Sequence, residues 1–95
     1  MTSDSPSVQV DKSWVHGSPG RECVISCAVY SDPPANVRWY RETMLLDTNE
    51  NRRMEQFGVR HRLVIHYVRE EDFGNYSCYA ENQLGKSRGF IELSG

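Results

Sequence analysis

The chain lacks a long apolar stretch. No segment of its 95 residues approaches the roughly 20 apolar residues that a membrane-spanning helix requires, and residues 1–7 are polar, without the apolar centre of a signal peptide. We therefore interpret the chain as a fragment of a longer protein. Its length suits one small domain with a modest hydrophobic core and is too short for two such domains.

An excess of one charge is also missing. The 11 basic and 13 acidic residues give a net charge of -2, which calls for neither a nucleic acid nor an anionic membrane as partner. A group of arginines nevertheless lies between Arg52 and Arg69. These arginines fit either a polyanion-binding patch, such as a heparin site, or ordinary solvated strands with interspersed acids, and we favour the second interpretation.

Residue spacings typical of metal sites and catalytic centres are absent as well. His16, His61 and His66 are scattered, without a Cys-x-x-Cys or His-x-x-x-His spacing that would bring ligands together. No nucleophile elbow, phosphate-binding loop or acid–base pair accompanies them. We therefore expect no bound metal, no cofactor and no enzymatic activity.

Helix-length periodicity is not found, and short stretches alternate apolar with polar residues instead, which predicts β-strands. The expected strands cover residues 7–10, 13–16, 21–30, 37–41, 52–57, 61–67, 76–82 and 87–93, with a further short strand possible at 44–46. Turn-forming Gly, Pro, Asn and Asp residues separate them. This spacing predicts an antiparallel sandwich or barrel. We expect one domain over residues 7–94, preceded by a disordered or linking N-terminus at 1–6.

Three motifs narrow the fold. Cys27, Trp39 and Cys78 follow one another in the Cys, Trp, Cys order, and Tyr76 lies two residues before the second cysteine, inside the segment Asp-Phe-Gly-Asn-Tyr-Ser-Cys. The segment Ala-Glu-Asn-Gln-Leu-Gly follows at residues 80–85. Together these residues resemble an I-set immunoglobulin domain, and the resemblance covers nearly the whole chain. It implies an all-β, immunoglobulin-like two-sheet antiparallel sandwich.

The resemblance implies a disulfide between Cys27 and Cys78, with the indole of Trp39 packed against it. Such a bridge between facing sheets closes a long loop, which stabilises a domain by about 4 kcal/mol on the chain-entropy model. Cys23 departs from the family pattern. By strand alternation its side chain faces the core, where an unpaired cysteine behaves as a small apolar residue, and we favour this interpretation over a redox, metal or intermolecular disulfide role.

Further core residues follow from the same resemblance. Tyr76 occupies the position of a tyrosine corner. The family's aspartate before this corner, here Asp72, usually pairs with an arginine at the start of the fourth main strand. Arg53, just before the apolar Met54, is the expected partner. Independently of the resemblance, Trp14 near the first edge strand either closes one end of the core or covers a domain junction, and we favour the first interpretation.

A narrower resemblance is carried by three segments. Ser-Trp-Val-His at residues 13–16, the segment 71–78 and the final Ile-Glu-Leu-Ser-Gly at 91–95 are similar to neuronal adhesion proteins of the lachesin, klingon and IgLON type. This similarity implies an extracellular, disulfide-bonded glycoprotein module at the cell surface, whose parent protein reaches the membrane through an anchor outside this fragment. It also implies protein partners, homophilic or heterophilic, among other immunoglobulin-superfamily ectodomains.

Two other functional classes remain open. I-set domains also serve as structural spacers in large intracellular muscle proteins of the titin kind, where reducing conditions would keep the cysteines as thiols. The same modules build the ectodomains of receptors that carry a cytoplasmic kinase or phosphatase. Fold alone does not distinguish these classes from an adhesion module.

Two candidate sites lie on the strand of Cys78 and its neighbours. Asn75 begins the sequon Asn-Tyr-Ser, in the expected turn before that strand, and is either a glycosylation site or an unmodified turn residue. If Trp39, Cys78 and Ile91 point inward, then their chain neighbours point outward on one sheet. The resulting candidate protein-binding residues are Tyr40, Tyr79 and Phe90, with a polar rim of Arg38 and Arg88. A cross-strand ladder that only stabilises the sheet explains the same pattern equally well.

Overall fold

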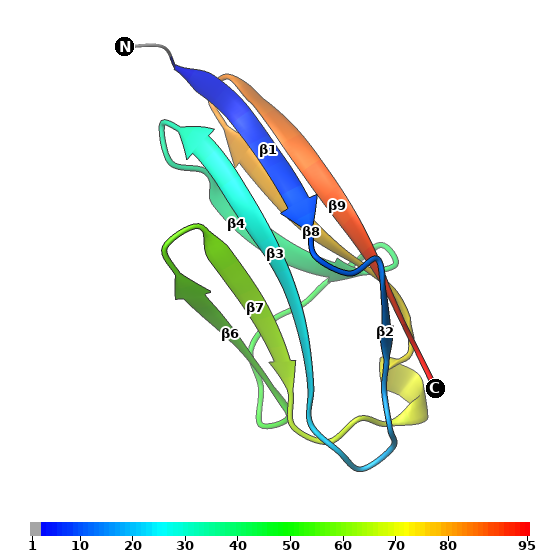
Figure 1. The fold of residues 1–95 in the computed structure, drawn as a ribbon. Helices are drawn as coiled ribbons and strands as arrows, with labels where there is room; N and C mark the ends of the chain where they lie inside the picture. The colour runs from blue at the N-terminus through cyan, green and yellow to red at the C-terminus, as the bar shows by residue number, and fades with distance from the viewer. Residues whose placement is uncertain (1–2) are drawn as a thin grey trace.

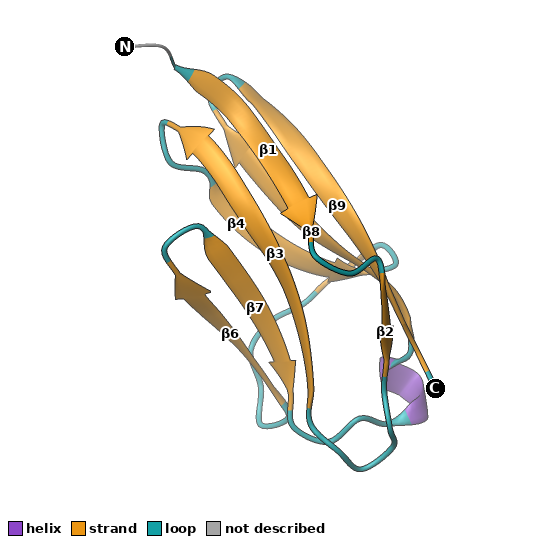
Figure 2. Cartoon of the chain, viewed as in Figure 1, coloured by secondary structure: helices purple, strands orange, loops and turns teal. Residues whose placement is uncertain are grey.

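Two β-sheets pack face to face (Figure 1 and Figure 2). The apolar residues that alternate with polar ones along their strands form one core between them. The computed structural model describes residues 3–95. The four-stranded sheet has the strand order β1 (Asp4–Val10), β3 (Cys23–Asp32), β7 (Arg60–Ile65) and β6 (Arg52–Phe57). The five-stranded sheet has the order β2 (Trp14–His16), β9 (Gly85–Ser94), β8 (Gly74–Asn82), β4 (Asn36–Arg41) and β5 (Met44–Leu45). The predicted all-β two-sheet sandwich is confirmed.

Every predicted strand is present, with small shifts at the strand ends. The short segment near residue 44 forms β5, and a single 3-10 turn over Glu70–Asp72 is the one helical element in residues 3–95 (Figure 2). The expectation for the N-terminus is corrected, because β1 begins at Asp4 and pairs with β3. Residues 4–6 therefore belong to the sheet, whereas residues 1–2 lie outside the described part of the chain.

Neighbouring strands pair antiparallel, except that β2 pairs in parallel with β9 at one edge of the five-stranded sheet. The start of β1 and the end of β9 lie toward opposite ends of the molecule (Figure 1). Within residues 3–95 no helix has the length and apolar character needed to cross a membrane.

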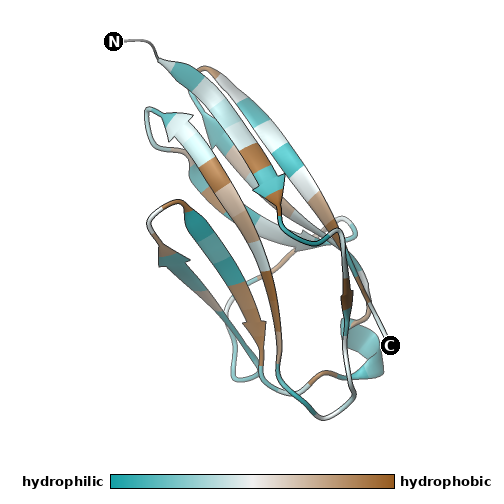
Figure 3. Ribbon diagram, viewed as in Figure 1, coloured by the Kyte–Doolittle hydropathy of each residue, from teal (hydrophilic) through white to brown (hydrophobic). Residues whose placement is uncertain are grey.

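The hydrophobic core lies between the two sheets. Along the strands, hydrophobic residues alternate with hydrophilic ones (Figure 3). Cys27 on β3 and Cys78 on β8 form a disulfide that joins the two sheets. Trp39 of β4 is only 3% exposed and belongs to the same buried cluster. The unpaired Cys23 is also buried in this cluster, and burial raises the pKa of its thiol. Its thiol is therefore protonated and unreactive at neutral pH.

Tyr76 fixes the turn that leads into β8. Its hydroxyl donates a hydrogen bond to the backbone oxygen of Asp72, which is the geometry of a tyrosine corner. Burial, and secondly the negative charge of Asp72, raise the pKa of Tyr76 far above its ordinary range, so the phenol stays protonated. The Oδ2 atom of Asp72 accepts the backbone N–H of Arg69, which secures the start of the 3-10 turn.

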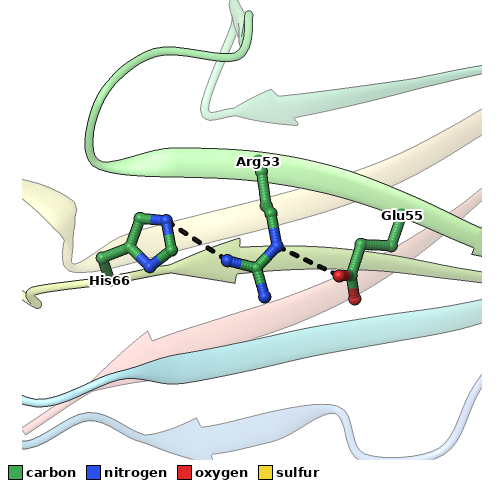
Figure 4. Close-up of polar contacts among 3 residues, drawn as sticks. All are labelled: Arg53, Glu55 and His66. Carbon is green, nitrogen blue, oxygen red and sulfur yellow. Dashed lines mark hydrogen bonds and ion pairs between the residues drawn. The ribbon is translucent and has the colours of Figure 1, made fainter.

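The expected ion pair between Arg53 and Asp72 is not formed. The side chain of Arg53 points to the outer face of the four-stranded sheet, where it binds Glu55 at 3.0 Å and contacts His66 at 3.3 Å (Figure 4). Its neighbour Arg52 lies on the same side of the strand as the half-buried Met54, and it contributes positive potential near Tyr76. Because side chains alternate across a strand, Arg53 faces away from the core. The Nε of Arg52 donates to the backbone oxygen of Asp47 at 2.9 Å.

Asn82 ties together three segments that are distant in sequence. Its Nδ2 atom donates hydrogen bonds of 3.0 Å to the backbone oxygens of Asp4 and Pro33. Its Oδ1 atom accepts the backbone N–H groups of Leu84 and Gly85 in the turn between β8 and β9. One side chain thus connects the start of β1, the turn after β3 and the β8–β9 hairpin.

Replacing Asn82 with alanine is expected to lower the free energy of unfolding by about 1–3 kcal/mol, because buried or shared backbone groups lose their partners. Asn82→Asp keeps the acceptor for the hairpin turn and loses both donated bonds, so an intermediate loss is expected. Gln83→Ala, at an exposed neighbour, serves as the control. Chemical denaturation measures all three, and equal stabilities for Asn82→Ala and the control would refute this role.

Candidate protein-binding face

The outer face of the five-stranded sheet gathers the aromatic side chains that alternate with core residues. Trp39, Cys78 and Ile91 are buried, as expected. Their chain neighbours project to the other side of β4, β8 and β9. The register places Arg38, Tyr79 and Arg88 in one row across these strands, and Tyr40, Ser77 and Phe90 in the next row. We call Arg38, Tyr40, Tyr79, Arg88 and Phe90 the aromatic face.

Part of the aromatic face is consolidated by its own contacts. The rings of Tyr40 and Tyr79 meet edge to face, with centroids 6.1 Å apart. The guanidinium carbon of Arg88 lies 5.2 Å from the centroid of Tyr40 and 5.0 Å from that of Tyr79, so one cation contacts both rings. Both tyrosines are half-buried as a result. These contacts stabilise the sheet whether or not the face binds a partner.

Phe90 is not explained by that ladder. Its side chain is 54% exposed, although it stands in the same row as Tyr40 and Ser77. Ser77 faces outward by alternation and is nevertheless only 2% exposed, because large side chains flank it on both strands. Phe90 is therefore the aromatic ring of this row that remains open to a partner, and large aromatic side chains contribute strongly to protein contacts.

Trp14 extends the aromatic surface and corrects an expectation. It is 52% exposed and does not close the end of the core. The parallel pairing of β2 with β9 sets Trp14 opposite Glu92, so its ring lies on the outer side of the five-stranded sheet. Its indole N–H donates to the hydroxyl of Ser94, and its ring contacts His16 at a centroid distance of 6.3 Å.

Charged residues flank the central row of this surface on both sides, and Glu81 and Lys86 follow in the row beyond the arginines. Arg38 and Arg88 stand in the row of Tyr79, on one side of the row that holds Ser77. Glu92 lies in the row on the other side of Ser77, opposite Asn75. Two residues along a strand span about 7 Å, so the positive row and Glu92 lie at similar distances from the central row. Desolvation, and secondly the neighbouring carboxylate of Glu81, raise the pKa of Tyr79.

Asn75 lies within this surface and not in a turn as expected. Strand β8 begins at Gly74, so Asn75 is the second residue of the strand and pairs with Glu92. Its side chain is exposed on the same outer side as Ser77 and Tyr79, because these residues are two and four positions along one strand. The candidate glycosylation site and the candidate binding residues therefore share one sheet face.

The arginines of the other sheet do not form an open basic patch. On the outer face of the four-stranded sheet, Arg53 is paired with Glu55 and Arg60 is paired with Asp11. Arg62 lies over the ring of Phe57 at 5.3 Å. Acidic and aromatic partners thus accompany the basic side chains on this face, which agrees with a solvated strand surface.

A shallow groove opens between the two sheets beside β4 and β6. Its lining includes Trp39, Met54 and His61, and its volume is about 370 Å³. Burial lowers the pKa of His61, so the imidazole is neutral at pH 7. Within residues 3–95, no three His, Cys, Asp or Glu side chains come together in a group that could hold a metal ion. The groove thus gathers no metal ligands, whereas the aromatic face carries an edge-to-face ring pair and two contacts of Arg88 with aromatic rings.

The bridged sheets, the buried tryptophan and the tyrosine corner together define an immunoglobulin-type domain. Comparison with known families agrees: the family model described as immunoglobulin domain matches residues 5–82. The chain belongs to this family, whose domains are typically non-catalytic modules and commonly bind other proteins.

Relatives of the chain include both cell-surface and intracellular proteins. It is 35% identical over 82 residues to a Caenorhabditis elegans tyrosine-protein phosphatase Lar-like, which covers 84% of this chain and 4% of the phosphatase. It is 37% identical over 68 residues to Gallus gallus smooth muscle myosin light chain kinase, and this match covers 72% of the present chain and 4% of the kinase. It is 30% identical over 95 residues to human IgLON family member 5, and this match covers 98% of the present chain and 28% of the relative. The chain thus spans a small part of each relative.

Among solved structures, the chain superimposes on one from the complex of Dpr2 Ig1-Ig2 with DIP-Theta Ig1-Ig3. The TM-score is 0.88 at 24% identity, and the match covers 97% of this chain and 32% of the other. At this identity the likeness establishes the shared fold. It agrees with the I-set type of sandwich that the sequence predicts.

Proposed function

We propose that this chain is an extracellular recognition module of a membrane-anchored cell-surface adhesion protein of neuronal type, which binds other proteins and catalyses no reaction. Three observations support the proposal: the disulfide between Cys27 and Cys78, the sequon at Asn75, and the similarity to IgLON family member 5 over 98% of the chain. Disulfides persist in oxidising compartments, and sequons are used in secreted proteins.

The exposed Phe90 on the aromatic face is the observation that carries the binding proposal. Aromatic side chains bury large area at a low entropic cost, and arginines commonly form the polar rim around them. Phe90 and Trp14 both remain more than half exposed, while Tyr40 and Tyr79 beside them are held rigid by Arg88. A prearranged surface of this kind loses little freedom on binding.

A second copy of the chain is the partner that the charge pattern favours. A two-fold axis that runs across the strands, along the row of Ser77, would bring β9 of one copy against β9 of the other in the opposite direction. The row of Arg88 in one copy would then face the row of Glu92 in its partner, twice in the symmetric pair. An axis along the strands would instead set Arg38 against Arg88, which is repulsive.

Mutation of the aromatic face tests this function. Tyr79→Ala combined with Phe90→Glu is expected to abolish concentration-dependent dimer formation of the oxidised chain in sedimentation velocity. Phe57→Glu is the matched control, because Phe57 is an exposed aromatic stacked with an arginine on the opposite sheet. Circular dichroism verifies that each variant folds. Equal self-association of the double variant and the wild-type chain would refute the proposed binding face.

A structural spacer in an intracellular muscle protein is the second candidate. The 37% identity to smooth muscle myosin light chain kinase favours it. The two candidates differ in redox compartment, because a cytosolic spacer would hold Cys27 and Cys78 as thiols. A non-reducing peptide map of the protein from its native tissue is expected to recover these two cysteines in one disulfide-linked peptide pair. Recovery of free thiols at both positions would favour the spacer.

A further inference from the structure

The sequon Asn75-Tyr76-Ser77 begins in the row that borders the outer surface we assign to binding, and it ends at Ser77 in the central row of that surface. Asn75 stands opposite Glu92 on β9, one row from Tyr40, Ser77 and Phe90. Hydrogen bonds with Glu42 hold its backbone: the N–H of Asn75 donates to the Oε1 of Glu42, and its carbonyl accepts the N–H of Glu42. The position of the exposed side chain is thereby fixed on the surface.

We propose that Asn75 carries an N-linked glycan and that this glycan covers the aromatic face, so that glycan occupancy decides whether the face can bind. The effect on binding rests on the proposed function above. The covering of the face does not. In the transfer, the Nδ2 of Asn75 forms a bond to C1 of the first sugar, while the bond between that carbon and a lipid-linked diphosphate breaks. The amide loses one proton and the lipid diphosphate leaves.

The structure indicates when this transfer has to take place. Ser77, whose hydroxyl completes the sequon, is 2% exposed, and Tyr76 between the two is 1% exposed. Strand β8 is paired on both sides, with β4 and with β9. A transferase therefore reaches this sequon only before β8 closes into the sheet. The bridge to Cys78, the next residue after the sequon, competes with the transfer. Both occupied and unoccupied chains are the expected products.

A glycan at Asn75 is large relative to the distances on this face. The row of Phe90 is about 7 Å from the row of Asn75, and N-linked glycans are bulky and strongly hydrated. In the two-fold arrangement proposed above, Asn75 of one copy also faces the row of Tyr79 in the other copy. The sugar would then occupy the space that the second copy requires.

Hydroxyl-radical footprinting read by mass spectrometry tests the shielding without any binding partner. The chain is secreted from animal cells, and its occupied fraction is compared with unmodified chain made in bacteria and oxidised. We expect a mass higher by that of a glycan located at Asn75. We also expect loss of labelling at Tyr79 and Phe90, with unchanged labelling of Phe57 on the opposite face. An unmodified Asn75, or equal labelling of Tyr79 and Phe90 in both forms, would overturn the proposal.

Moving the glycan to the other sheet provides the matched control. Val24 is exposed on the outer side of the four-stranded sheet, and Val24→Asn completes a sequon with Ile25 and Ser26. The variant Asn75→Gln/Val24→Asn is expected to carry a glycan and still label at Tyr79 and Phe90. In sedimentation velocity, both Asn75→Gln/Val24→Asn and Asn75→Gln should form dimers. The wild-type chain that carries the glycan should stay monomeric at the same concentrations. Dimers of the occupied wild-type chain would contradict the control of binding, whereas monomers in every form would contradict the proposed self-association alone.

Discussion

Replacing Cys27 and Cys78 together with alanine is expected to lower the free energy of unfolding by about 4 kcal/mol. The bridge closes a loop with a sequence separation of 51 residues, and the chain-entropy model assigns this amount to a loop of that length. Domains of this size have a total stability of about 5–15 kcal/mol, so the variant should lose a large part of it. The midpoint of thermal unfolding should fall by about 15–30 °C.

Guanidinium denaturation of the wild-type chain, the double variant and Cys23→Ala measures this effect. Cys23 is the matched control, because it is a buried cysteine of the same core that forms no bridge. Cys23→Ala should lose only the packing of a small side chain and should keep the disulfide. A double variant that is no less stable than Cys23→Ala would show that the core alone holds the two sheets together.

Reversing one charge on the aromatic face is expected to weaken self-association by at least about a hundredfold. Each of Arg88→Glu and Glu92→Arg converts a facing pair of opposite charges into a like pair in the two-fold arrangement. The pair occurs twice in the symmetric dimer, and a tenfold loss at each occurrence corresponds to about 1.4 kcal/mol. The combined variant Arg88→Glu/Glu92→Arg should recover dimer formation, because both facing pairs become attractive again.

Arg62→Glu controls for the loss of a stacked arginine, since Arg62 contacts an aromatic ring on the opposite face as Arg88 does on this one. It should leave the dissociation constant of the dimer unchanged. Analytical ultracentrifugation over a concentration series supplies all of these constants. Failure of the combined variant to recover association would exclude the pairing of Arg88 with Glu92, even if the single variants are impaired.

Local alternation made much of the fold predictable from sequence. A period of two distinguishes inward from outward positions, so the burial of Trp39, Cys78 and Ile91 follows from the chain alone. The same rule placed Tyr40, Tyr79 and Phe90 on one outer surface, and the register bears out that placement. Whether the surface binds a partner is a separate matter that alternation does not address.

The errors arose where a position depends on long-range pairing or on a single residue of register. Choosing Arg53 instead of Arg52 as the inward arginine is a slip of one residue, and such a slip changes the face. Trp14 was assigned to the core because its outward position depends on parallel pairing with β9, at the far end of the chain. The hydrogen bonds by which Asn82 connects three segments were not predicted, because its partners Asp4 and Pro33 are distant in sequence.

Cys23 shows what alternation predicts and what it leaves out. Its burial follows from its position two residues before Ile25 and four before Cys27 on β3. The raised pKa of the thiol follows from that burial, and both agree with a small apolar core residue. The hazard of this residue lies in folding, where Cys23 and Cys27 compete for Cys78 before the sheets close.

Amide NMR spectra of the isotope-labelled chain, made in bacteria and oxidised, show whether the outer face of the five-stranded sheet binds protein when they are recorded from micromolar to near-millimolar concentration. A second copy of the chain is the simplest partner. We expect concentration-dependent shifts on β4, β8 and β9, centred on Tyr40, Tyr79, Arg88 and Phe90. Spectra that do not change with concentration, or shifts confined to β1, β3, β6 and β7, would contradict this expectation.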